Sequence, residues 1–120
     1  MIAGISGALC VSLGAFGAHG LEDFLEAHGR TGTYETAVKY HFYHSLLLVL
    51  LGIMKKQYAT VPLLNSAAIC CIAGMVIFSG SLYVLCLTNV SWLGAITPVG
   101  GLFLMAAWLM IGIGAWKATK

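Results

Sequence analysis

Charged side chains are scarce in this sequence. They make up 8% of its 120 residues, whereas a soluble globular domain carries roughly 25%. Hydrophobic residues make up 60%, and the mean hydropathy is +0.94. The shortage of charge argues against a soluble domain and predicts an integral membrane protein whose partner is the lipid bilayer. A net charge of +2 is also too small to favour nucleic acid.

The patterns of common enzymes and metalloproteins are also missing. The four cysteines lie in apolar segments without CxxC or zinc-type spacing, which is typical of small packing residues. There is no nucleophile elbow, phosphate-binding loop or metalloprotease motif. We therefore expect neither an enzyme nor a cofactor. The start of the chain has no basic n-region, so we expect the first apolar segment to be a retained helix.

What remains is a set of long apolar segments. Each helix needs about 20 residues to cross the hydrocarbon core, so the chain has room for one domain. We predict an all-α bundle of four transmembrane helices over residues 2–18, 37–54, 62–87 and 93–116. Small residues form two rows on the first helix, Gly4-Ala8-Ser12 and Ser6-Cys10-Gly14-Ala18. Such rows allow close helix packing and predict either a central helix or a homo-oligomeric contact, with Gly14 touching a neighbour.

The connection between the first two helices carries its own signals. Apolar spacing over Leu21–His28 predicts a short amphipathic helix in the membrane interface, ended by Gly29. Thr31-Gly32-Thr33 predicts a break, with Thr33 as the N-cap of the next helix. Glu35 and Lys39 are spaced for an ion pair. The acidic trio of the connection is interpreted as a solvated face, or else as a cation-collecting one: Glu22, Asp23 and Glu26.

The last two helices leave alternatives open. The third, 26 residues long, would measure roughly 39 Å, so it should tilt or loosen at Phe78–Tyr83. The fourth either begins near Trp92 and kinks at Pro98, or begins with Thr97 as N-cap and Pro98 in the first turn. In the second case residues 91–96 form an interfacial connector.

Basic residues predict the orientation in the membrane. Four lysines fall on the side shared by both termini: Lys55, Lys56, Lys117 and Lys120. The other side has Arg30, with Lys39 at its edge. The positive-inside rule therefore places both termini in the cytoplasm, in what we expect to be a bacterial inner membrane.

Four motifs resemble the transmembrane-protein-256-like family, catalogued in bacteria as a domain of unknown function. They cover nearly the whole chain: Gly14-Ala-Phe-Gly-Ala-His-Gly-Leu21, Thr36-Ala-Val-Lys-Tyr-His41 with His44, Phe78-Ser-Gly-Ser-Leu-Tyr83, and Ile96-Thr-Pro-Val-Gly-Gly101 with Trp108. The resemblance implies a small integral membrane protein of about four helices. It brings no activity, substrate or cofactor with it.

Under the predicted topology, these motifs place polar side chains in the outer half of the membrane: His19, His41, His44, Ser79, Ser81 and Thr97. They are candidates for a metal site built on the three histidines with Glu22 or Glu35, or for a pocket holding a proton, ion or small molecule. The favoured interpretation is hydrogen bonding between helices. His44 should be neutral, with a partner such as His19, Ser79 or Thr97.

Two classes of function follow. The first is a scaffold or accessory subunit that packs through small-residue helix faces against copies of itself or a larger membrane complex. The alternative is a small transport or permeation-type protein with an outward-facing polar pocket. An unwound, water-facing Ser79–Ser81 segment would favour transport, and a continuous dry helix would favour the scaffold.

Overall fold

The chain is entirely helical in a computed structural model that describes all residues, 1–120. The elements are α1 (Ile2–His19), α2 (Glu22–Ala27), α3 (Thr31–Gln57), α4 (Leu63–Thr88), the 3-10 turn η1 (Ser91–Ala95) and α5 (Thr97–Ala118). Four helices are long and apolar enough to cross a membrane. The predicted four-helix membrane fold is therefore confirmed.

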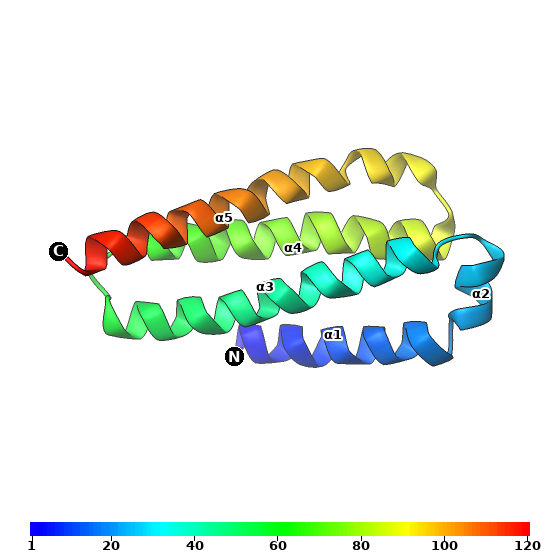
Figure 1. The fold of residues 1–120 in the computed structure, drawn as a ribbon, viewed down its shortest axis with the longest axis horizontal. Helices are drawn as coiled ribbons and strands as arrows, with labels where there is room; N and C mark the ends of the chain where they lie inside the picture. The colour runs from blue at the N-terminus through cyan, green and yellow to red at the C-terminus, as the bar shows by residue number, and fades with distance from the viewer.

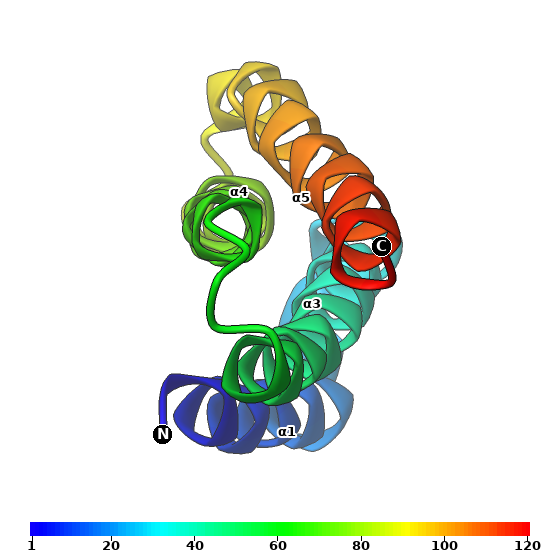
Figure 2. The same ribbon diagram turned by 90° about the vertical axis from the view of Figure 1, so that its left-hand side faces the viewer.

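The long helices follow one another across the molecule (Figures 1 and 2). α1 packs against α3, α3 against α4, and α4 against α5. The main core joins α3, α4 and α5 through buried side chains such as Leu51, Leu64 and Ala107. The expectation of a central α1 is wrong, because this helix lies at the edge and buries only Cys10 and Gly17.

The pairing of α4 with α5 depends on glycine. A Cβ atom at Gly100 would lie 2.8 Å from the Phe78 Cα, and one at Gly74 would lie 2.9 Å from the Leu104 backbone nitrogen. Lipid tails do not drive helices together as water does, so close backbone approach has to supply the contact energy. These two glycines bring the backbones of α4 and α5 together.

In the connection between α1 and α3, the end of α2 agrees with the prediction, but the start of α3 does not. Gly29 ends α2 with φ +63°, and the amides of Gly29 and Arg30 bond back to Glu26 and Leu25. The predicted break at Thr31–Thr33 is absent, because α3 starts at Thr31 without a side-chain cap. Thr36 donates its hydroxyl to the Gly32 carbonyl, a bond compatible with helix. The second span is therefore longer than the predicted 37–54.

The two remaining alternatives are resolved by the backbone. α4 is continuous from Leu63 to Thr88, so it does not loosen at Phe78–Tyr83. Residues 91–95 form a separate turn, and Pro98 lies in the first turn of α5, as the connector alternative predicts. Thr97 is not the N-cap of α5, however, because Ile96 holds that position and Thr97 is the first helical residue, with its hydroxyl 2.7 Å from Ser81 Oγ.

Candidate functional site

A chain of hydrogen bonds joins α1, α3 and α4 through His41. The two ring nitrogens of His41 lie 3.1 Å from Ser6 Oγ and 3.2 Å from the Tyr83 hydroxyl. Ser6 Oγ lies 2.6 Å from Ser45 Oγ, and Ser45 lies 2.9 Å from the His41 carbonyl. We call Tyr83, His41, Ser6 and Ser45 the His41 chain.

The carbonyl at the end of the His41 chain sets its direction. A carbonyl only accepts, so Ser45 donates its proton to it and accepts from Ser6. Ser6 has then spent its own proton and accepts from Nε2–H of His41. Tyr83 in turn donates to the free Nδ1. When His41 is neutral, its proton is on Nε2, Nδ1 accepts from Tyr83, and all four groups point their protons the same way.

His44 adopts the opposite tautomer one helical turn further along α3. Its Nδ1 lies 2.7 Å from the Tyr40 carbonyl and must donate there. Trp108 on α5 donates its indole N–H to Nε2 at 3.2 Å. The expectation of a neutral, hydrogen-bonded His44 agrees with this geometry. The suggested partners His19, Ser79 and Thr97 are wrong, because His44 faces α5 at the level of Trp108.

The other predicted polar residues also link helices. Ser79 is buried and donates to the Ala37 carbonyl of α3 at 2.8 Å. Ser81 donates to Phe78 within α4, and its oxygen lies 2.7 Å from the Thr97 hydroxyl of α5. No buried side-chain nitrogen or oxygen lacks a hydrogen-bond partner. These contacts match the favoured interpretation, in which the polar groups tie helices together.

The proposed metal ligands do not come together. No group of three or more His, Cys, Asp or Glu side chains is placed to hold a metal ion. His19 is exposed at the end of α1, 13 residues beyond the Ser6 that contacts His41, which is about 20 Å of helix. His41 and His44 point to different neighbours. Spacing along one helix could not reveal either fact.

The six predicted residues do not share one pocket. His41 and Ser79 line a groove of about 360 Å³ between α1 and α4, whose walls are otherwise mainly apolar side chains such as Ile5 and Val76. Thr97 lines a separate surface hollow beside Gly94. His44 is closed in by Trp108. The single convergent pocket is therefore replaced by separate interhelical contacts.

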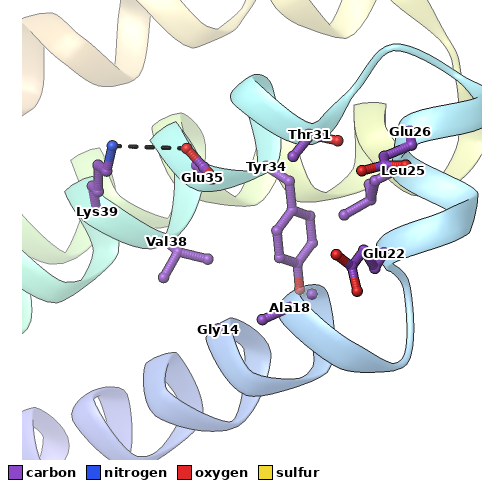
Figure 3. Close-up of a pocket in the computed structure, with 11 residues that line it drawn as sticks. Gly14, Ala18, Glu22, Leu25, Glu26, Thr31, Tyr34, Glu35, Val38 and Lys39 are labelled. Carbon is purple, nitrogen blue, oxygen red and sulfur yellow. Dashed lines mark ion pairs between the residues drawn. The ribbon is translucent and has the colours of Figure 1, made fainter.

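Figure 3 shows a cavity of about 320 Å³ among α1, α2 and α3, which sequence reasoning did not assemble. Its walls carry Glu22, Glu26 and Glu35, with Lys39 paired to Glu35 at 3.9 Å as predicted. Tyr34 reaches across to α1, where its hydroxyl donates to the Leu13 carbonyl at 2.7 Å. The sequence did contain an indication of this acidic cavity, since all four acidic residues fall between positions 22 and 35.

Four apolar helices joined by buried hydrogen bonds define an integral membrane protein. Residues 13–101 match the family model described as "Protein of unknown function (DUF423)", and the chain belongs to that family. The UPF0382 membrane protein YwdK of Bacillus subtilis is 40% identical over 98% of this chain and 94% of its own length.

Two further relatives extend the comparison. The UPF0382 membrane protein SH2409 of Staphylococcus haemolyticus is 46% identical over 94% of this chain and 93% of its own length. The UPF0382 inner membrane protein YgdD of Escherichia coli K12 is 35% identical over 100% and 90%. No solved structure matches the chain. The family carries no assigned activity, so function has to be argued from the site.

Proposed function

We propose that this protein is a scaffold or accessory subunit of a membrane assembly, and that its partner packs against the outer face of α1. The observation that carries the proposal is the continuity of α4 through Ser79–Ser81. Ser79 is only 2% exposed and bonds α3. A transport path through the bundle needs polar groups that face water. In this bundle the buried polar groups are hydrogen-bonded to other groups of the protein.

The outer face of α1 supplies the contact surface. Ser6, Cys10 and Gly14 of one small-residue row turn toward α3. The other row, Gly4, Ala8 and Ser12, is exposed. A second helix can approach such a row closely, which is how helices pair in lipid.

Photo-crosslinking tests this surface. A photoreactive side chain placed at Ala8 or Ser12 should give protein adducts of discrete mass in native membranes, and mass spectrometry identifies them as a second copy or another protein. The matched control is Ile69 of α4, which is 68% exposed and carries a large side chain. Adducts with lipid alone at all three positions would rule the scaffold out.

The transport alternative is favoured by one observation, the position of the His41 chain beside the groove between α1 and α4. Imidazole and hydroxyl groups exchange protons with water, and a proton path would have to continue through the groove, because the series itself ends at the His41 carbonyl, which has no proton to release. Reconstituted vesicles with an internal pH dye would test this. Proton flux that His41→Gln abolishes, in a variant that still folds, would favour transport over the scaffold.

We further infer that both termini face the cytoplasm of a bacterial inner membrane. The bias of the lysines supports this orientation, and the E. coli relative is named an inner membrane protein. In a cysteine-free background, an impermeant maleimide should label a cysteine at Glu26 but not one at Gln57. We also infer that the family extends to the transmembrane-protein-256-like proteins, on the four motifs given above.

A further inference from the structure

We propose that a groove at the lysine-bearing end of the molecule binds one anionic phospholipid. The groove encloses about 600 Å³ between the start of α1, the last turns of α3 and the early part of α4. This volume falls within the range of roughly 300–1,000 Å³ that small-molecule sites occupy. The groove includes no residue of the His41 chain, and it shares only Gly4 with the small-residue row on the outer face of α1.

The groove exists because α1 is shorter than α3. The two helices have 18 and 27 residues, which at 1.5 Å per residue is about 27 Å against about 40 Å. They are joined through α2 at one end, so α1 stops short of the other end of α3 (Figure 1). Gly4 and Gly52 line the gap, and neither has an atom within 4 Å of a Cβ position. The groove is therefore open to a chain-like ligand.

The walls and the mouth of the groove differ in chemistry. Aliphatic side chains such as Val49, Ile53 and Ile72 form the walls. Lys55 and Lys56 stand at the end of α3, both exposed, and neither belongs to an ion pair. All four acidic residues belong to α2 or to the first turns of α3, which lie at the opposite end of the molecule (Figure 1). Positive charge at the mouth is therefore uncompensated by any acidic side chain of the groove.

This arrangement suits a phospholipid better than a protein partner of the same sequence. An acyl chain lies along the aliphatic walls while the phosphate sits beside the two lysines, which attract anionic lipid near a membrane surface. A second copy docked symmetrically here would place lysines against lysines. The ligand class is an anionic phospholipid, whichever side of the membrane this end faces.

Native mass spectrometry of the detergent-solubilised full chain tests the charge requirement. Phosphatidylglycerol should bind in preference to phosphatidylcholine with the same acyl chains. Lys55→Gln with Lys56→Gln should weaken phosphatidylglycerol binding on the order of 30-fold, from about 1 kcal/mol for each lysine. Lys117→Gln with Lys120→Gln removes the same charge from the same end without touching the groove, and should leave binding unchanged.

A filling variant tests the groove itself. Gly52→Leu should abolish the preference for phosphatidylglycerol, whereas Gly112→Leu, at an equally open position on α5, should preserve it. Melting temperatures of both variants establish that they fold. Equal losses from the two lysine pairs, equal binding of the two lipids, or wild-type binding by Gly52→Leu would each overturn the proposal.

Discussion

The α4–α5 contact and the α1–α3 contact use different forces. α4 and α5 are held by close van der Waals packing, because Gly74 and Gly100 let each helix approach backbone atoms of the other. α1 also has glycine contacts with α3, but it adds hydrogen bonds that join Ser6 with His41 and Ser45, and Tyr34 with the Leu13 carbonyl. A close van der Waals contact is destabilised when a larger side chain is introduced. A contact held by hydrogen bonds is destabilised when a donor or acceptor is removed. The variants below separate the two.

The largest effect is expected at the closest backbone approach. Gly100→Val should cost about 3 kcal/mol or more, since the added atoms would meet backbone atoms of Phe78, which cannot turn aside as a side chain can. Folded yield and melting temperature in detergent measure the loss. Gly112→Val, at an open position of the same helix, should behave as wild type. Similar stability of the two variants would mean that α4 and α5 are not in close contact.

Adding a side chain at a glycine of α1 should cause a smaller loss of stability. A Cβ at Gly17 would overlap the ring of Tyr34, so Gly17→Ala should cost about 1–3 kcal/mol. A side chain can move where a backbone cannot, which is why the value lies below that of Gly100→Val. Gly7→Ala serves as the control, since its Cβ meets nothing within 4 Å. Indistinguishable melting temperatures for Gly17→Ala and Gly7→Ala would contradict a close contact between Gly17 and Tyr34.

Removing a hydrogen-bond partner should loosen α1 alone. Ser6→Ala leaves Nε2–H of His41 without its acceptor, at a cost of about 1–3 kcal/mol. Cys10 is only 1% exposed where it faces α3, so its labelling by a membrane-permeant maleimide should become faster. Cys71 of the α4 core should stay protected. If both cysteines react faster, the whole bundle has opened and the His41 chain is not specific to α1.

The smallest effect is expected at Gly14. A Cβ there would lie 3.3 Å from Val38 Cγ1, so the predicted helix contact is present. The same residue lines the cavity of Figure 3, which gives a longer side chain room. Gly14→Leu should therefore cost less than about 1 kcal/mol. A loss as large as that of Gly17→Ala would show that the cavity is too narrow to accept the leucine.

The candidate site was only partly predictable. Polar residue types in apolar segments predicted hydrogen bonds between helices, and His41, Ser79 and Thr97 each make one. Their partners were not predictable, because the register of one helix against the next depends on glycine contacts far along the chain. The three histidines suggested as metal ligands lie apart for the same reason. Helical spacing places His41 and His44 on one face, but it does not bring His19 of α1 to them.

The sequence by itself determined the local features of the protein. Runs of apolar residues set the four helices, Gly29 ended α2, and four of the five lysines fell at one end, because length, backbone preference and charge are properties of each segment. The tertiary structure alone decided which of the two small-residue rows on α1 meets α3. It also decided the opposite tautomers of His41 and His44 and the groove left by the short α1. These depend on distances between segments, which a linear pattern does not contain.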